Sequence, residues 1–417
     1  MNDRAALELL LEHGPLSRTR IGSLTGLSKP TASQLLARLE AAGLVVATGT
    51  AGGRSGPRAQ LYALHAGAAY VAGLDVTPGR ITAAVADLTG RIVGRGELSV
   101  PVAATAPASG TAPASRTAAV VGQVTEALDR AAAAAGLDRS AVRRLVVGTP
   151  GAFDPRTGRL RYADHLPGWH SPALPEELAA ALPMPVAYEN DVNLAAVAEQ
   201  RLGAARGHRD FVLLWNETGL GAALVLGGRL HRGWTGGAGE VGFLPVPGRP
   251  PVRGVRALNA GGYQELAGVE AVSVLAAGLG IAPTPGGGPG ADDPVAVAVS
   301  LLSRAAARPE GPHLELLRRH ATALATGLAS LVCVLDPEIV VLSGAVNAAG
   351  GEVLRALTAA ELAELAPSSP RLILSGVPGQ PVLRGALETA LAVTRDEVFD
   401  TSRSPSPGPS PGPGPSP

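Results

Sequence analysis

The stretch over residues 70–100 constrains the fold of this chain more than any other. It reads YVAGLDVTPGRITAAVADLTGRIVGRGELSV, so apolar runs alternate with turn-forming Gly, Pro and Asp. This pattern predicts three consecutive strands joined by tight turns. A helix is expected over 118–136 and a further strand from 142, and strand and helix signals go on alternating to about residue 397. We therefore expect an α/β fold.

Residues 1–65 follow a different pattern, with three short helices and a hairpin. The helix boundaries carry cap residues, which are Ser17 and Ser28 at the starts and Gly14, Gly26 and Gly43 at the ends. The strand LVVATG follows, then the turn TAGGRSGPRA and the returning strand QLYAL. This order of elements is typical of a winged helix-turn-helix domain, in which the second helix of the turn pair enters a DNA groove.

The third helix, over 28–42, is the expected DNA-binding element. Three leucines are expected to face inward: Leu35, Leu36 and Leu39. The polar residues left for base edges or phosphates are Ser28, Lys29, Thr31, Ser33, Gln34 and Arg38. Arg54 and Arg58, on the Gly-rich hairpin tip, suit phosphates or a narrow groove. The alternative is a small helical module for oligomerisation or protein docking.

The distribution of charge agrees with DNA binding by this end of the chain alone. The formal net charge of all 417 residues is zero. Between residues 18 and 58, however, six Lys or Arg stand against one acid, Glu40. A basic end on a neutral chain indicates one module that meets an anion.

Composition divides the chain and limits its class. We expect domains over 1–65 and 66–397, and a disordered Pro/Gly/Ser tail over 398–417. Cys333 is the only cysteine, which excludes an intramolecular disulfide and a multi-cysteine zinc site. Its apolar surroundings, SLVCVLDP, predict a buried structural thiol. The N-terminus does not fit a signal peptide and no stretch fits a membrane span, so we expect a cytoplasmic protein.

Several motifs together resemble the ROK family of repressors and sugar kinases, specifically its members with an N-terminal winged helix. The matching stretches are LSKPTASQLLARLEAAGLV, GLDVTPGR, VVGTPGAFDPRTGRLRYADHLPGW, YENDVNLAAVAE, GLGAALVLGGRLHRGWTGGAGEVGF and LDPEIVVLSGAV. They cover almost the whole chain and come in the family's order. The resemblance implies two actin/ribonuclease-H-like lobes with a cleft between them, assembled as a homodimer or a dimer of dimers.

The two phosphate loops of the family's kinases are degraded here. The first retains Asp75, but Thr77 and Pro78 replace glycines, and proline has no amide hydrogen to donate. The second, NETGLG, retains Thr218 and Gly219, but Glu217 replaces a glycine. A carboxylate beside a polyphosphate is repulsive. We therefore expect that ATP does not bind and that kinase activity is lost.

The sugar side of the family's site is better preserved. The resemblance implies that Asn190, Asp191, Glu240 and Glu265 contact a sugar, together with Gly151. Asp191 stands at the position of the kinases' catalytic base, and here we expect it only to bind ligand. The alternative is that Asp191 is a helix cap and the two glutamates are surface charges. Trp169 and Trp234 are expected either to line the ligand site or to pack in the core.

The family's zinc site is replaced throughout. By the same register, Phe243, Arg256, Leu258 and Tyr263 stand where the family has one histidine and three cysteines. We expect no zinc and no other cofactor, and we expect apolar packing of Leu258 and Tyr263 to hold this segment instead. Phe243 also removes one polar contact to the sugar. Four other histidines have no metal-like spacing and are expected to face solvent or to pack: His165, His170, His208 and His231.

These observations predict a transcription regulator, a repressor of carbohydrate-related genes whose partners are operator DNA and a sugar or sugar-derived molecule. Two alternatives remain open from the sequence. One is an active ATP-dependent sugar kinase with a DNA-binding head, which Asp191 favours. The other is a DNA-binding dimer that senses no ligand, which Phe243 favours.

Overall fold

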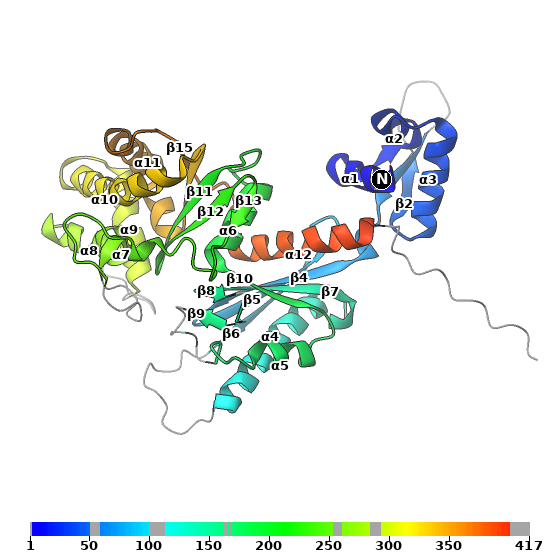
Figure 1. The fold of residues 1–417 in the computed structure, drawn as a ribbon, viewed down its shortest axis with the longest axis horizontal. Helices are drawn as coiled ribbons and strands as arrows, with labels where there is room; N and C mark the ends of the chain where they lie inside the picture. The colour runs from blue at the N-terminus through cyan, green and yellow to red at the C-terminus, as the bar shows by residue number, and fades with distance from the viewer. Residues whose placement is uncertain are drawn as a thin grey trace, which may run out of the picture.

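The computed structural model describes residues 2–50, 59–100, 113–154, 156–157, 159–161, 166, 168–252, 261–283 and 293–400. Two α/β lobes follow a small N-terminal domain, which confirms the expected fold class (Figure 1). Several residues singled out above lie outside the described residues: Arg54, Arg58, His165, Arg256 and Leu258. The same holds for residues 401–417 of the tail.

The N-terminal domain has the predicted winged-helix order. Its elements are α1 (Asn2–His13), β1 (Leu16–Ser17), α2 (Arg18–Thr25), α3 (Lys29–Ala41), β2 (Val45–Thr50) and β3 (Gln60–Leu64). The side chains of Ser17 and Ser28 accept hydrogen bonds from backbone amides of the helices that they cap, as expected. Ala42 is the C-cap of α3, and Gly43 follows it in the left-handed conformation. Leu35, Leu36 and Leu39 are buried.

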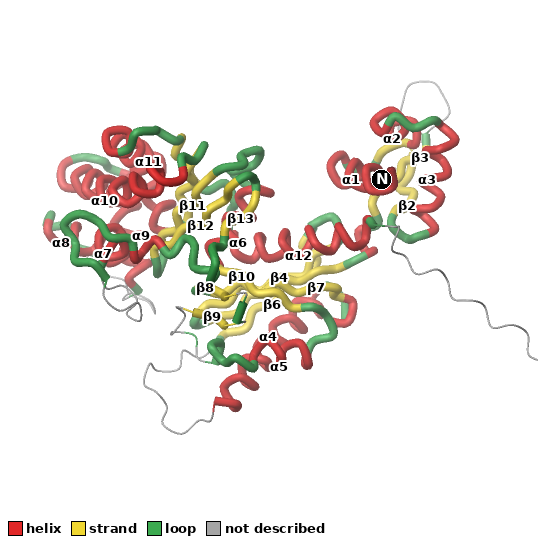
Figure 2. The backbone as a smooth tube through the Cα atoms, viewed as in Figure 1, coloured by secondary structure: helices red, strands yellow, loops and turns green. Residues whose placement is uncertain are grey.

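The first lobe is built on a five-stranded sheet with the order β10-β7-β4-β5-β6. Its strands are β4 (Tyr70–Thr77), β5 (Arg80–Asp87), β6 (Ile92–Ser99), β7 (Val142–Thr149) and β10 (Val186–Asn190), and a small hairpin of β8 (Ala152–Asp154) and β9 (Arg159–Arg161) stands beside them. The first three strands form the predicted antiparallel meander, and β4, β7 and β10 are parallel. The helices α4 (Pro113–Ala134) and α5 (Leu174–Ala181) cover one face (Figure 2).

The second lobe repeats this plan. Its sheet order is β13-β12-β11-β14-β15, so both lobes have the order 3-2-1-4-5 when strands are numbered within the lobe. The strands are β11 (Phe211–Asn216), β12 (Leu220–Leu226), β13 (Arg229–His231), β14 (Ile339–Ser343) and β15 (Arg371–Leu374). The helices on its outer side are α7 (Gly262–Ala267), α8 (Val269–Gly278), α9 (Pro294–Ala307), α10 (Gly311–Leu335) and α11 (Ala345–Leu365).

Two helices, α6 (Asp191–Leu202) and α12 (Pro381–Phe399), lie between the two sheets and share one core with both. Glycines permit their close approach. A Cβ atom on Gly385 of α12 would stand 1.8 Å from the carbonyl oxygen of Leu194 in α6. A Cβ atom on Gly73 of β4 would stand 3.0 Å from the Cβ of Ala386 in α12. The central helices are therefore packed backbone to backbone against each other and against the first sheet.

The C-terminal end of α12 belongs to the core of the winged-helix domain. Phe399 is 3% exposed and packs in one cluster with Leu7, Leu10 and Leu64 of that domain. Leu88, from the turn between β5 and β6, completes the cluster, and its carbonyl accepts a hydrogen bond from Arg395 of α12. The winged-helix domain is therefore attached to the lobes through a shared apolar core as well as through the chain. Figure 1 shows the end of α12 beside this domain.

The prediction of a buried thiol at Cys333 is wrong, because Cys333 is exposed. The apolar stretch around it is the end of the helix α10, in which side chains turn to a new direction at every residue. Val332 is therefore buried, while Val334, two residues further along the helix, is 81% exposed. None of the described helices is long and apolar enough to span a membrane.

Candidate ligand cleft and DNA-binding surface

The carboxyl ends of β4, β7 and β10 bring the expected ligand residues to one edge of the first sheet. Asp75 of β4 pairs with Gly148 of β7, and Asn190 of β10 pairs with Thr149 of β7. Gly151 follows two residues after the end of β7. In open α/β sheets this edge is where ligands bind.

Asn190 and Asp191 are held at the point where β10 passes into α6. The Asn190 side-chain oxygen caps α6 by accepting a hydrogen bond from the Asn193 amide at 3.0 Å. The Asn190 side-chain nitrogen donates to the Gly151 carbonyl at 3.1 Å and to the Asp191 carboxylate at 3.0 Å. The helix cap is thus Asn190, and the Asp191 carboxylate lies beside it. The structure brings three of the expected residues, Gly151, Asn190 and Asp191, into one hydrogen-bonded group.

A second group of polar residues supports this turn, and the sequence analysis did not find it. Glu189 is buried, and its carboxylate accepts a hydrogen bond from the Asn193 side chain at 2.9 Å. The same carboxylate pairs with Arg232 at 2.7 Å. Arg232 follows β13 of the second lobe, so this ion pair joins the two lobes next to Asn190. No local pattern in the sequence indicated that Glu189 would pair with a residue of the other lobe.

Four half-buried carboxylates gather in the cleft. Burial raises the pKa of Asp191 to about 7; the Val192 amide opposes the shift, and the negative charges of Asp75, Glu240 and Glu217 add to it. Burial raises the pKa of Asp75 to about 6, and Arg80 opposes this. Burial also raises the pKa of Glu217 and of Glu240. The cleft therefore presents hydrogen-bond acceptors that hold protons unusually well, a property of polar-ligand sites.

Glu217 lies in the loop between β11 and β12, where the family's kinases have a phosphate loop. The amide of Ala345, the first residue of the helix α11, interacts with its carboxylate and partly opposes the rise in its pKa. The Glu217 amide donates to the Gly219 carbonyl at 3.2 Å, while Thr218 at the tip is exposed. A helix N-terminus is a preferred place for a phosphate. In this protein the Glu217 carboxylate is an anion close to the start of α11.

The first loop is a tight turn between paired strands. Thr77 pairs with Arg80 across β4 and β5, so the connection consists of Pro78 and Gly79 only. The Thr77 hydroxyl donates a hydrogen bond to the Arg80 carbonyl at 2.9 Å. Asp75 lies two residues inside β4, and its negative charge adds to the raised pKa values of Asp191 and Glu217.

Glu265 and Tyr263 of α7 both make contacts within the protein. Glu265 of α7 is half-buried and pairs with Arg249 at 3.1 Å. Tyr263 is fully buried, and its hydroxyl donates to the Leu324 carbonyl at 2.7 Å, so it holds the start of α7 as expected. Phe243 is half-buried and supplies no metal ligand. The residues present do not fit zinc, and among the described residues no group of three His, Cys, Asp or Glu is placed to hold a metal.

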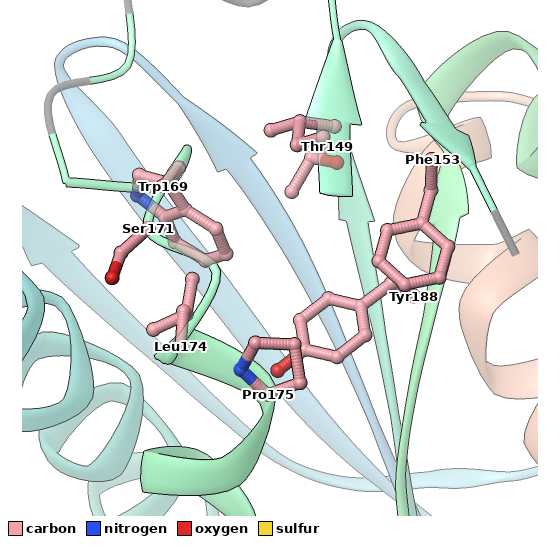
Figure 3. Close-up of a pocket in the computed structure, with 8 residues that line it drawn as sticks. Thr149, Phe153, Trp169, Ser171, Leu174, Pro175 and Tyr188 are labelled. Carbon is pink, nitrogen blue, oxygen red and sulfur yellow. The ribbon is translucent and has the colours of Figure 1, made fainter. Parts of the chain in front are cut away.

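An aromatic recess, which the sequence analysis did not predict, opens beside Asn190. It is lined by Thr149, Phe153, Leu160, Trp169, Ser171, Leu174, Pro175 and Tyr188 (Figure 3). Trp169 is 6% exposed and packs in the core, which is one of the two roles expected of it, and it also lines this recess. Trp234 does not pack in the core: it is 78% exposed, with the Arg156 guanidinium 4.8 Å from its ring centre.

On the DNA-binding domain, intramolecular contacts occupy several of the polar residues of α3. Ser28 and Thr31 bond to each other through their hydroxyls at 2.8 Å. Ser33 donates to the Lys29 carbonyl and accepts from Arg18, and Arg38 pairs with Asp3 at 2.6 Å. Lys29, Thr31 and Gln34 are exposed. These three side chains at the start of α3 are the best placed to reach a DNA groove.

The fold and the cleft define a two-lobe protein of the sugar-kinase type that carries an N-terminal winged helix. The model of the ROK family matches residues 71–392, and the chain belongs to that family. The model of the MarR family matches residues 3–54, a range that includes α2, α3 and β2 of the winged helix.

Solved structures and curated proteins agree with this assignment. A ROK hexokinase from Thermus thermophilus is 30% identical, with a TM-score of 0.60 over 78% of this chain and 99% of its own. A ROK family transcriptional regulator, a homolog of the E. coli MLC protein, shares the fold with a TM-score of 0.69 over 96% of this chain and 98% of its own, at 20% identity. The bifunctional enzyme NanE/NanK of Brucella suis is 38% identical over 43% of this chain and 30% of its own length. A putative xylose repressor of Caldicellulosiruptor sp. is 23% identical over 59% of each chain. The chain thus spans about a third to two thirds of the length of these curated relatives.

Proposed function

We propose that this protein is a cytoplasmic, DNA-binding transcriptional regulator, a repressor of carbohydrate-related genes that responds to a sugar-type ligand and has no kinase activity. One observation carries the proposal. The helix α12 packs along one part of its length against α6, whose start carries Asn190 and Asp191, and at its end it forms part of the core of the winged-helix domain.

The proposed signal runs through α6 and α12. Asn190 and Asp191 stand at the start of α6, so a ligand held by them would move this helix when the lobes close. Because Gly385 lets α12 touch the backbone of α6, a shift of α6 is passed on directly. At the far end, Phe399 and the Arg4–Asp396 ion pair would carry the shift into the winged helix. Packed elements of this kind move as rigid bodies.

The proposed ligand is a sugar, because the cleft offers several carboxylates and an amide as fixed acceptors and donors for vicinal hydroxyls. The relatives whose names mention a hexokinase or a xylose repressor support this class. The proposed DNA partner is an operator with two half-sites, read by the two winged helices of a homodimer. Ligand binding would change the spacing of these helices and thus the affinity for the operator.

A sugar kinase is the second candidate, and one observation favours it. The pKa of Asp191, raised to about 7, is in the range that suits a general base at neutral pH. Against it stands Glu217, whose carboxylate takes the place of a phosphate at the start of α11. The repressor and the kinase are distinguished by measuring ADP release from ATP and Mg²⁺ in the presence of each of a panel of hexoses. Turnover that Asp191→Asn abolishes would replace the repressor proposal.

The DNA-binding part is tested with duplexes selected from a random pool by the full-length protein. Lys29→Ala is expected to weaken binding and to reduce the slope of log K against log salt by about 1, because one phosphate contact is lost. Arg319→Ala, which removes another exposed cation, from α10 in the second lobe, is the matched control and should leave the affinity and the slope unchanged. Equal binding by the two variants, or failure to enrich any sequence, would count against this part of the proposal.

A further inference from the structure

A segment of the second lobe, residues 232–239, is docked on the first lobe beside the expected ligand residues. The Arg232 side chain donates to the Glu189 carboxylate in β10, with 2.7 Å between Nε and Oε2. A Cβ atom on Gly236 would stand 2.2 Å from the carbonyl oxygen of Phe153 in β8, so the two backbones are in direct contact. The lobes are therefore joined here by an ion pair and by backbone packing.

Glu189 connects Arg232 to the turn that carries the ligand residues. One oxygen of its carboxylate accepts from Arg232, and the other accepts from the Asn190 amide at 3.0 Å. This second oxygen also accepts from the Asn193 side chain at 2.9 Å. Because the Asn193 amide donates to the Asn190 side chain, Glu189 fixes Asn190 both directly and through Asn193.

The opposite end of α6 is held at the points where the chain passes between the lobes. These crossings are residues 203–210, between α6 and β11, and residues 375–380, between β15 and α12. Glu199 is fully buried, and its carboxylate accepts hydrogen bonds from the amides of Ala204 and Gly376, one in each crossing. Such crossings absorb the backbone changes when two lobes move, so contacts at the ligand end of α6 move most.

We propose that Arg232 is a positioning residue of the ligand cleft, and that it acts through Glu189 to hold Asn190 ready for ligand only while the lobes are docked. The Glu189 side chain is 11% exposed, and a buried carboxylate that loses its cation is unfavourable. When the lobes separate, Glu189 therefore turns to solvent and releases Asn190. The inference rests on the proposed ligand cleft and adds a link from the second lobe to it. By reciprocity, a ligand bound at Asn190 favours docking.

The positioning role is tested without ligand, by amide hydrogen exchange of the full-length protein. Arg232→Gln removes the cation and keeps a polar side chain. Peptides that contain Asn190 and Asn193 should exchange at least about 10-fold faster, because this turn opens more easily, while peptides that contain Ala204 keep their rate. Arg229→Gln, which removes another exposed cation, from β13 just before this segment, is the matched control and should leave all these rates unchanged.

A double variant separates positioning from simple packing. In Glu189→Gln combined with Arg232→Gln, the neutral amide at position 189 no longer requires a cation, and its oxygen can still accept from Asn193. We therefore expect the double variant to recover most of the slow exchange at Asn190 that Arg232→Gln alone loses. A loss of packing around Arg232 would not be rescued by a change in its partner.

A third variant tests the dependence on docking while both charges stay in place. Gly236→Ala should push the segment away from Phe153, because the added Cβ atom meets backbone. Docking is followed through Trp234, which is 78% exposed and has the Arg156 guanidinium of the first lobe 4.8 Å from its ring centre. Gly236→Ala should increase the acrylamide quenching of Trp234 and speed exchange at Asn190 together. Increased quenching with slow exchange at Asn190 would overturn the inference.

Calorimetric titration with D-glucose and D-xylose adds the ligand. Arg232→Gln should weaken binding of the sugar that binds by about 3- to 10-fold, a coupling usual for residues in contact. If exchange at Asn190 is unchanged in Arg232→Gln, if it rises equally at Ala204, or if the double variant does not restore it, the inference is wrong and the sugar-responsive regulator stands. Faster exchange at Asn190 that the double variant restores, with no binding of either sugar, supports the role of Arg232 and counts against the proposed ligand class.

Discussion

The contact between α6 and α12 gives the sharpest prediction, because one atom tests it. Gly385 faces the backbone of α6, and a Cβ atom there would stand 1.8 Å from the Leu194 carbonyl oxygen. An ordinary contact of this kind is about 3.4 Å long, so Gly385→Ala requires the two helices to separate by about 1.6 Å (3.4 minus 1.8) at this point. Neither backbone can rotate away as a flexible side chain would.

We expect Gly385→Ala to lower the free energy of unfolding, because the steric clash outweighs the gain in helix propensity. Overpacking a well-packed core costs about 1–3 kcal/mol, and backbone on both sides places this site at the upper end of that range. Replacing glycine by alanine within a helix returns about 1 kcal/mol through helix propensity. We therefore expect a net loss of about 1–2 kcal/mol and a lower midpoint of thermal unfolding. The displaced α12 should also lose part of its ability to transmit ligand binding to the DNA-binding domain.

A second glycine provides the control. Gly122 also lies in a helix, α4, but it is exposed and a Cβ atom there would meet nothing within 4 Å. Gly122→Ala should stabilise the protein by about 0.5–1 kcal/mol. Both variants are compared by thermal melting followed by circular dichroism, and by operator affinity with and without ligand. If Gly385→Ala melts at or above the temperature of Gly122→Ala and responds fully to ligand, the proposed path through α6 and α12 is wrong.

Three further predictions concern the cleft. The folded protein holds the proton of Asp191 up to a pKa of about 7, whereas the unfolded chain releases it near 4, so folding stability should fall as pH rises from about 4 to about 7. Urea unfolding across this range should show a flatter profile for Asp191→Asn, and an unchanged profile would contradict the burial of this carboxyl. Pro78→Gly alone should not produce an ATP-dependent thermal shift while Glu217 remains, and a clear shift with ATP and Mg²⁺ would refute the role given to Glu217. Glu217→Ala should lower stability by about 0.5–2 kcal/mol in denaturant titrations, because the start of α11 loses a capping carboxylate, and no loss would mean that Ala345 finds another acceptor.

Much of the fold follows from local signals in the sequence. The caps Ser17 and Ser28 mark helices that begin where the structure begins them. The strand–turn–strand pattern around Pro78 gives the β4–β5 hairpin, because two short apolar runs separated by turn-forming residues favour antiparallel pairing. The turn from β10 into α6 follows from Asn190, a residue that caps helices well. Because β10 ends at Asn190, the next residue, Asp191, lies at the edge of the sheet and therefore in the cleft.

The parts that could not be predicted depend on contacts between distant segments. The recess joins Phe153, Trp169 and Tyr188 from three separate elements, and its shape depends on how the β8–β9 hairpin folds back. The partner of Glu217 is an amide of α11, far along the chain, so the sequence could suggest repulsion of phosphate but not substitution for it. The pairing of Arg38 with Asp3 likewise requires α1 to cross α3, which no local pattern indicates.

The central claim is that a ligand in the cleft controls DNA binding, and one measurement tests it directly. Fluorescence anisotropy of a selected operator is recorded for the unchanged protein and for Glu240→Ala, each with and without the sugar that binds most tightly in calorimetry. The account predicts that this sugar changes the operator affinity of the unchanged protein by about 5–150-fold, because allosteric coupling of this kind amounts to about 1–3 kcal/mol. The same sugar should have almost no effect on the operator affinity of Glu240→Ala. Identical operator affinity with and without every sugar, in both proteins, would contradict it.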